Sequence, residues 1–526
     1  MTRPNFIVFI TDQQRADHLG CYGNPIVSTP VIDDLAVRGW RADEMHVASP
    51  ICMPNRASLI TGRMPSCHGT RHNGIELSLA ERTLPQVLAE AGYRTAHVGK
   101  SHLQNMLDAP GQYPRPTDPP HAGEARQEDL TRHGQEIWRR WEENPEFEIA
   151  TPYYGFQTVD LCIEHGDAQY GHWRRWVRSQ ARDADNLIGP EHALPTPNVA
   201  LTAAGQAWRT RLPEELYPTS WVADRAVSRL REMAAADKPF FLYCSFPDPH
   251  HPFTPPGQYW DRYKPADMPL PASFDMPHED LPPHVRWLYE RRDDGTAVKN
   301  SPAPFACTAR EAREALALNY GSISFVDAAV GRVLEALRSL GVAGQTVVLF
   351  TSDHGDFMGD HQLLLKGPIH YRGLTRVPFI WMDPSAAPHS GASSALVQTI
   401  DIAPTILDRA GVLPWHGMQG QSLVPLIHGS ADSWRESLLV EEEGQRYYMG
   451  FPDRVRTRSL LTSRYRLSMY DRVSWGELYD RESDPEEVHN LWNDVSAAPL
   501  RAQLMEQLVH SMLAFSETSP APTQRA

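Results

Sequence analysis

The run FIVFI at residues 6–10 is the feature that most constrains the fold. It holds only apolar residues with no polar alternation, which is typical of a strand buried on both faces of a parallel sheet. Patterns of helix, or of helix followed by an apolar strand, recur along the chain at residues 29–40, 83–100, 220–246 and 323–353. Because such alternation marks an α/β domain, we predict an α/β fold with a large, mixed or mostly parallel sheet flanked by helices.

The pattern changes after about residue 420. Short alternating runs at residues 437–443, 454–462, 465–471 and 477–480 predict a small antiparallel sheet, and a helix is expected near residues 500–513. We therefore expect two domains. They are a main α/β domain at residues 1–420, with insertions rich in Pro, Trp and charge at about 103–215 and 252–310, and a smaller C-terminal domain at residues 421–526.

Composition excludes some classes of function. The formal net charge of −15 argues against nucleic acid as a partner, because binding a polyanion needs a basic surface. It does not exclude a small anionic substrate held in a local basic pocket. The 6 cysteines are scattered without framework spacing, so no disulfide scaffold is predicted. Without a signal-peptide core or a membrane span in the sequence, we expect a cytoplasmic protein with no membrane partner.

Two pairs of polar residues follow predicted strands. Asp12 and Gln13 come directly after the first strand, and Asp353 and His354 come after TVVLFTS. Functional groups in open α/β sheets collect at the carboxyl ends of the strands, so these four side chains could hold one divalent cation. The alternative for either aspartate is a helix N-cap or a turn.

The stretch SPICMPNRASLITG at residues 49–62 predicts a helix that begins on a cysteine. Pro54 suits the first turn of a helix, so Cys52 is expected at the N-terminus, where free N–H groups favour an anion. Arg56, four residues on, lies on the same face. The alternative for a lone cysteine is a buried small hydrophobic residue. A cysteine phosphatase is excluded, because its loop needs a longer gap between Cys and Arg.

These residues carry a resemblance. Residues 52–56, CMPNR, match the C-x-P-x-R signature of type I sulfatases, in the alkaline phosphatase superfamily, and ASLITGRMPSCHG continues it. Further blocks resemble that family in its order: NFIVFITDQQR, GYRTAHVGKSH, FPDPHHPF, TSDHGDFMGDH, LLLKG with TRVPFI, and ELYDRESDPEEVHNL. The resemblance covers nearly the whole chain and implies an alkaline-phosphatase-like fold whose main domain is catalytic.

The resemblance also implies cofactors. Cys52 would be converted by a formylglycine-generating enzyme to Cα-formylglycine, whose hydrated aldehyde attacks the sulfur or phosphorus of a small anionic ester. One divalent metal ion, Ca²⁺ or Mn²⁺, would be bound by residue 52 and by Asp12, Gln13, Asp353 and His354.

Further roles follow from the same resemblance. Lys100 and Lys366 would neutralise the non-bridging oxygens of the ester, and Arg56 would hold the formylglycine hydroxyl. His250 would protonate or stabilise the leaving alkoxide, and His102 would take a proton from the second hydroxyl so that sulfate is eliminated.

The remaining polar candidates have simpler interpretations. Asn73, in HNG, is either a turn residue or a substrate-binding residue. We expect structural roles for five other histidines, His68, His72, His251, His361 and His370.

Three positions depart from the usual sulfatase pattern, two of them at the predicted metal site. Gln13 stands where most members have Asp, and His354 where most have Asn, a change that suits Mn²⁺ or a similar ion. Phosphonate monoester hydrolases look like this chain at both positions, whereas Lys100 and His102 look like sulfatases. Arg372, after Tyr371, replaces the usual Glu, and we have no mechanistic account of it.

Three activities remain open. An arylsulfatase-like hydrolase of sulfate monoesters, promiscuous toward phosphonate monoesters and phosphodiesters, ranks first. The alternative is a phosphonate monoester hydrolase or phosphodiesterase, and a transferase or mutase of the superfamily is more remote, because it would use Ser or Thr instead of Cys52. A non-catalytic binding protein ranks last. We expect a homo-oligomer.

Overall fold

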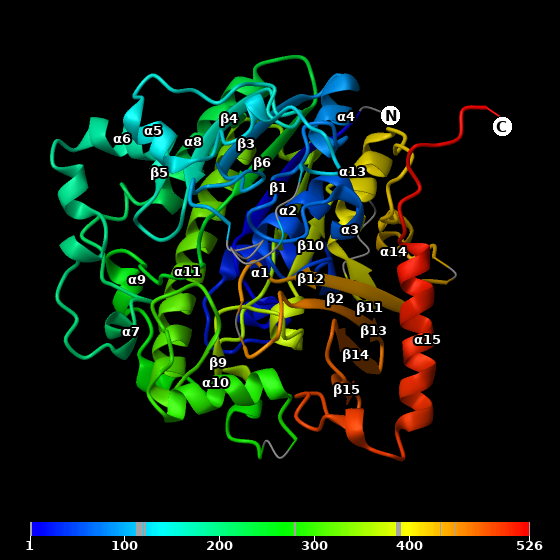
Figure 1. Cartoon of the computed structure of the whole chain (residues 1–526). Helices are drawn as coiled ribbons and strands as arrows, with labels where there is room; N and C mark the ends of the chain where they lie inside the picture. The colour runs from blue at the N-terminus through cyan, green and yellow to red at the C-terminus, as the bar shows by residue number, and fades with distance from the viewer. Residues whose placement is uncertain are drawn as a thin grey trace.

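A nine-stranded sheet forms the centre of the molecule (Figure 1). The computed structural model describes residues 3–111, 119, 122–277, 280–385, 391–431, 433–447 and 449–524. In spatial order the strands are β11 (Gly391–Gln398), β2 (Trp40–His46), β10 (Phe379–Met382), β8 (Thr346–Ser352), β1 (Asn5–Thr11), β6 (Phe240–Ser245), β3 (Arg94–Lys100), β4 (Thr158–Ile163) and β5 (Tyr170–Gly171). Only β10 and β5 run antiparallel to their neighbours, which confirms the predicted mixed, mostly parallel sheet.

Helices cover both faces of this sheet. On β1, Ile7 and Phe9 join one core cluster with residues of α1 (Pro30–Arg38), α8 (Pro218–Ala234) and α11 (Ala309–Ser339). Phe6, Val8 and Ile10 join a second cluster with residues of α2 (Cys52–Thr61), α4 (Leu84–Glu90) and α13 (Ile402–Ala410). Alternate side chains of a strand point to opposite faces, so a strand covered on both sides is apolar throughout, as FIVFI predicted.

The C-terminal part forms the predicted small antiparallel sheet, orange in Figure 1. Its strands are β12 (Ser437–Glu443), β13 (Arg456–Thr462), β14 (Tyr465–Tyr470) and β15 (Gly476–Asp480). The long helix α15 (Ala498–Ala514) packs Leu504 and Leu508 against Leu460 and Leu478 of this sheet. The remaining short helices outside the two insertions are α3 (Pro65–His68), α12 (Arg372–Thr375) and α14 (Val424–Ile427).

The two expected insertions contain short elements. Residues 103–215 hold α5 (Trp138–Glu143), α6 (His172–Gln180) and α7 (Ala200–Ala203) together with β4 and β5, so this segment also extends the main sheet. Residues 252–310 hold α9 (Gln258–Asp261), α10 (Pro283–Asp293) and β7 (Phe305–Ala306), which pairs with β9 (Leu363–Leu364). Residues 112–118, 120, 121, 278 and 279 of these insertions lie outside the described residues.

No described helix combines the length and the apolar character that a membrane span requires.

A glycine near the end of β3 allows two strands to approach closely. Gly99 has φ +104°, and a Cβ added there would lie 1.8 Å from the carbonyl oxygen of Ser245 on β6. Gly92 has a similar φ of +95° but no heavy atom within 4 Å of an added Cβ. Gly92 therefore isolates the cost of the backbone conformation from the cost of the clash.

We predict that Gly99→Ala destabilises the protein more than Gly92→Ala does. Gly92→Ala should lower the free energy of unfolding by about 1–2 kcal/mol, because a residue with a Cβ is strained at positive φ. Gly99→Ala should add a further cost of about 2 kcal/mol or more, because β3 or β6 must shift. Urea denaturation of both variants measures the difference, and equal unfolding midpoints would contradict it.

Candidate functional site

Two aspartates leave neighbouring strands at the same edge of the sheet. β1 and β8 pair in parallel with Thr11 opposite Ser352, so Asp12 and Asp353 follow side by side. The backbone N–H of Gln13 donates to Asp353 Oδ1 at 3.0 Å, which holds the residues after β1 against those after β8. The structure therefore brings together the two carboxylates that the strand pattern had placed at this edge.

Helix α2 places Cys52 against these carboxylates. The helix begins at Cys52, as Pro54 predicted, and the side-chain oxygen of Asn73 accepts a hydrogen bond from Met53 N at 3.1 Å. Cys52 is 1% exposed. Its Sγ lies 3.1 Å from His354 Nε2 and 3.8 Å from Asp12 Oδ1. Asn73 thus caps the helix beside the cysteine.

Arg56 binds both carboxylates from one turn further along α2. Its Nε donates to Asp353 Oδ2 at 2.8 Å, and an Nη lies 3.4 Å from Asp12 Oδ2. Its other Nη donates to Ser245 Oγ at 2.9 Å and to the carbonyl of Lys100 at 3.0 Å. The predicted placement of Arg56 on the face of Cys52 is confirmed, and every contact is buried.

Two lysine ammonium groups complete the cluster. Lys100, the last residue of β3, donates to Asp12 Oδ2. Lys366 Nζ lies within hydrogen-bonding distance of four acceptors, which are Gln13 Oε1 (2.8 Å), His250 Nε2 (2.8 Å), Cys52 Sγ (3.1 Å) and His354 Nε2 (3.2 Å). An ammonium has three N–H donors, so it can serve only three of them at once.

The positive charges shift the pKa values of the acidic groups. Burial raises the pKa of Asp12, but Lys100, Arg56 and Lys366 outweigh it and hold that pKa well below its usual range. Burial also raises the pKa of the Cys52 thiol, and Lys366, opposed by Asp12 and assisted by Lys100, leaves it lowered. The surroundings of residue 52 therefore stabilise negative charge.

His102 lies in the loop after β3, with an unusual φ of +55°. Glu136 holds this loop, since its carboxylate accepts from the backbone N–H of His102 at 2.7 Å, Leu103 at 3.1 Å and Gln104 at 3.2 Å. His102 Nδ1 is buried and has no hydrogen-bond partner among the described residues. Burial, then Lys100 and His165, hold the pKa of His102 well below its usual value, so its imidazole is neutral.

Three residues of the cluster were not predicted from the sequence. His165 Nε2 accepts from Lys100 Nζ at 2.5 Å. His251, expected to be structural, accepts at Nδ1 from Gln13 Nε2 at 3.1 Å, and Asp356 also accepts from that amide. His251 and Asp356 stood next to predicted residues in PHHP and SDHGD, whereas His165 follows β4, a strand that was not recognised.

Three other histidines with expected structural roles make contacts elsewhere. His68 Nε2 lies 3.0 Å from Ser58 Oγ, His72 Nε2 lies 2.9 Å from an Nη of Arg454, and His361 stacks on Tyr371 with 3.6 Å between ring centroids.

The small C-terminal sheet holds the loop that carries Lys366. His370 lies 2.7 Å from Ser459 Oγ through Nδ1 and 3.0 Å from Glu442 Oε2 through Nε2. Tyr470 OH donates to the carbonyl of Pro368 at 3.2 Å. Both contacts lie within four residues after Lys366, so the C-terminal sheet contributes to the position of the Lys366 ammonium.

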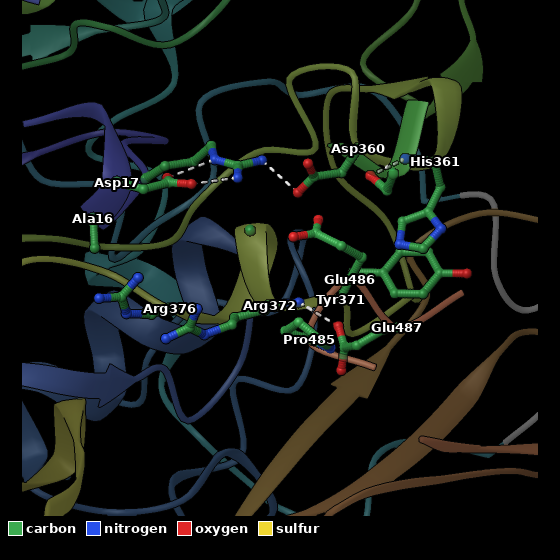
Figure 2. Close-up of a pocket in the computed structure, with 13 residues that line it drawn as sticks. Ala16, Asp17, Asp360, His361, Tyr371, Arg372, Arg376, Pro485, Glu486 and Glu487 are labelled. Atoms are coloured by element: carbon green, nitrogen blue, oxygen red, sulfur yellow. Dashed lines mark hydrogen bonds and ion pairs between the residues drawn. The ribbon is translucent and has the colours of Figure 1, made fainter. Parts of the chain in front are cut away.

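A cavity of about 100 Å³ lies between residues that follow β1, the loop around Asp360 and the segment of Glu486 and Glu487 (Figure 2). Arg15 lines it and pairs with Asp17 and Asp360, at 2.6 Å in each case. Glu487 accepts from the backbone N–H of Arg372 at 2.8 Å. Because Arg15 is paired with Asp17 and Asp360, we interpret the residues around the cavity as structural: their ion pairs hold the loop around Asp360 in place.

The donors around residue 52 fit a divalent cation. One ligand atom from each of Asp12, Cys52, Asp353 and His354 lies within 4.8 Å of the others. His354 Nδ1 donates to the carbonyl of Gly355 at 2.8 Å, which leaves the Nε2 lone pair facing the cluster, as in a metal-binding histidine. Carboxylate oxygens with one imidazole are a donor set that divalent metals accept.

Two family models match this chain, and together they span residues 4–513. The family model described as Sulfatase matches residues 4–412, and the one described as N-sulphoglucosamine sulphohydrolase, C-terminal, matches residues 359–513. The chain is 28% identical over 502 residues to an arylsulfatase of Clostridium perfringens, covering 93% of this chain and 90% of that protein. It is 27% identical over 530 residues to the multifunctional alkaline phosphatase superfamily protein PehA of Trinickia caryophylli, covering 95% and 93%.

A solved structure establishes the fold. The phosphonate monoester hydrolase of Agrobacterium radiobacter superposes with a TM-score of 0.76 at 24% identity, covering 100% of this chain and 98% of that one. The alkaline-phosphatase-like fold is thereby confirmed. Because the sulfatase model spans most of the chain and the C-x-P-x-R signature lies at the centre of the buried cluster, the chain belongs to the sulfatase family of the alkaline phosphatase superfamily.

Proposed function

We propose that this sulfatase-family hydrolase cleaves sulfate monoesters, with aryl sulfates as its preferred class, after a formylglycine-generating enzyme has converted Cys52. The observation that carries the proposal is the position of Cys52 at the N-terminus of α2. There its side chain meets the metal-type donors and the Lys366 ammonium in a buried cluster. Helix N–H groups and an ammonium together favour an anion at this point.

Two groups would complete the chemistry. One Ca²⁺ or Mn²⁺ bound by Asp12, Gln13, residue 52, Asp353 and His354 would act as a Lewis acid, and formylglycine at position 52 would supply a nucleophilic hydroxyl.

The residues of the chain bind and orient the ester. Lys100 and Lys366 neutralise its non-bridging oxygens, and Arg56 keeps residue 52 and the two carboxylates in a fixed arrangement. These side chains are almost fully buried, so their charges act in a site that excludes most water. Positioned donors in such a site stabilise the charge that develops in the transition state.

Two histidines handle protons. Lys366 donates to His250 Nε2 at 2.8 Å, while His250 Nδ1 donates to the carbonyl of His251. Lys366 and His250 thus share one proton. We propose that this proton is transferred to the leaving oxygen of the ester. Neutral His102 is the base that receives a proton from residue 52 when sulfate is released.

A second activity is supported by Gln13 and His354. Gln13 stands in place of the Asp of most sulfatases, which removes one negative charge near the cation, and His354 adds an imidazole in place of Asn. PehA, described as multifunctional, and the Agrobacterium phosphonate monoester hydrolase are similar to this chain. We therefore propose phosphonate monoesters and phosphodiesters as secondary substrates.

We predict a rank order for esters of one phenol. The sulfate monoester should have a kcat/KM roughly tenfold or more above those of the phosphonate monoester and the phosphodiester, a difference of about 1.4 kcal/mol in the barrier. Steady-state kinetics with the 4-nitrophenyl esters measure this directly. A higher kcat/KM for either phosphorus ester would make phosphonate or diester hydrolysis the main activity.

Conversion of Cys52 is testable by peptide mass spectrometry. Trypsin releases residue 52 in the peptide of residues 42–56 and Cys67 in the peptide of residues 64–71. After co-expression with a formylglycine-generating enzyme, the first peptide should carry an aldehyde in place of the thiol, and the second should keep its thiol. Full activity of a preparation in which Cys52 is unmodified would disprove the assignment.

Asp12→Asn should lose both metal and activity. Removing one charge from the donor set should reduce bound metal and lower kcat/KM about 100-fold or more. Asp160→Asn is the matched control, because Asp160 is also a buried carboxylate paired with two cations, Arg225 and Arg229, but lies outside the cluster. Elemental analysis and steady-state kinetics of both variants test this prediction. Normal metal content in Asp12→Asn would exclude Asp12 as a metal ligand.

A further inference from the structure

His165 differs from its neighbours in the cluster in being partly open to solvent. It follows β4 in the loop Glu164–His165–Gly166, and its side chain is 18% exposed, whereas those of Asp12 and Lys100 are fully buried. Its ring stacks on that of His250, with centroids 3.7 Å apart and planes inclined by 21°. His165 thus lies on the solvent side of the cluster and contacts two residues of the proposed chemistry, Lys100 and His250.

The contact with Lys100 has a defined direction. Lysine has only donors, so His165 Nε2 must accept from Nζ, and the ring proton must lie on Nδ1, which faces Glu164 Oε2 at 3.6 Å. Asp12 accepts a second N–H of the same ammonium. With two of its three N–H groups directed by Asp12 and His165, the direction of the third is fixed and it is left for the substrate.

The stacking contact restrains His250 in a different way. The His250 ring lies between His165 and His251, whose centroid is 4.1 Å away on a ring inclined by 24°. Its Nδ1 is anchored on the carbonyl of His251 and its Nε2 on Lys366. His165 covers the remaining ring face, so it limits the tilt of the imidazole that carries Nε2.

A metal ion is the competing interpretation of the same residues. Ligand atoms of Asp12, His165 and His250 also lie within 4.8 Å of one another. This set has only one carboxylate, Asp12, and the first metal-type set already uses it, whereas the first set has two carboxylates. Lys100 Nζ also binds both Asp12 Oδ2 and His165 Nε2, so its charge opposes a metal ion bound by this single carboxylate. The arrangement favours a role in orienting side chains.

We propose that His165 is a positioning residue with two separable effects, in which its Nε2 directs Lys100 toward the substrate anion and its ring holds His250 at the leaving group. This inference rests on the proposed sulfate ester chemistry. It assigns to the first insertion a part in the site that no motif of the family resemblance had indicated.

Two substitutions separate the effects. His165→Phe keeps an aromatic ring for His250 but removes the acceptor for Lys100, and His165→Gln keeps an acceptor near the place of Nε2 but removes the ring. His172→Phe is the matched control, because His172 belongs to the following helix α6, is 19% exposed and also pairs with a glutamate, Glu148. This control should keep wild-type kinetics.

The readout is kcat/KM for a series of aryl sulfates with leaving groups of different pKa. His165→Phe should lower kcat/KM about 10- to 100-fold for every ester, with an unchanged dependence on leaving-group pKa, because a misplaced binding group affects them all. His165→Gln should react like wild type with the most activated esters and lose progressively more with poorer leaving groups. Wild-type kinetics for both variants, or the same uniform loss in both, would overturn the proposal.

Crystal structures of the variants provide a second readout that does not depend on turnover. Lys100 Nζ should move away from its present place in His165→Phe, and the His250 ring should tilt in His165→Gln. Unchanged positions of both groups would overturn the proposal even if activity fell. If the wild-type enzyme hydrolysed no sulfate ester, the proposed function would fail, and this structural comparison would still decide the role of His165.

Discussion

One guanidinium joins the ends of the four central strands. Arg56 contacts Asp353 after β8, Asp12 after β1, Ser245 at the end of β6 and the carbonyl of Lys100 at the end of β3. A buried arginine is tolerated only when its donors are paired, and here each bond fixes a different strand. Because Arg56 belongs to α2, the same contacts determine where residue 52 lies relative to the metal-type donors.

Part of this site could be predicted from residue patterns alone. FIVFIT and TVVLFTS indicated strands that are directly followed by Asp12 and Asp353, and Pro54 indicated a helix beginning near Cys52. That the two strands are neighbours is a property of topology, which no local pattern contains. Lys100, Lys366 and His250 required the family resemblance, because isolated lysines and histidines carry no periodic signal.

His165 was not predicted because the sequence of β4 lacks the continuous apolar run of a buried strand. Asp160 interrupts its apolar run, and only the fold shows that Arg225 and Arg229 of α8 neutralise that carboxylate. β2 was missed for a similar reason. Its sequence WRADEMH carries Arg41, Asp43 and Glu44, and Glu44 pairs with arginines from distant parts of the chain. Buried or half-buried charges interrupt the apolar pattern of a strand. When their partners lie far away in the sequence, the strand cannot be recognised from its local residues.

The charge of the cluster has a consequence for how a substrate reaches it. Three cationic side chains, Arg56, Lys100 and Lys366, surround two carboxylates, whereas the whole chain carries a formal net charge of −15. The proposed anionic ester would therefore be repelled at long range by the net charge and attracted at short range by the cluster. Salt screens the long-range repulsion more strongly than the contacts in the buried cluster, so moderate ionic strength favours encounter without an equal loss of binding. A change in ionic strength should therefore alter the rate at which the anion reaches the site more than the strength with which the site holds it.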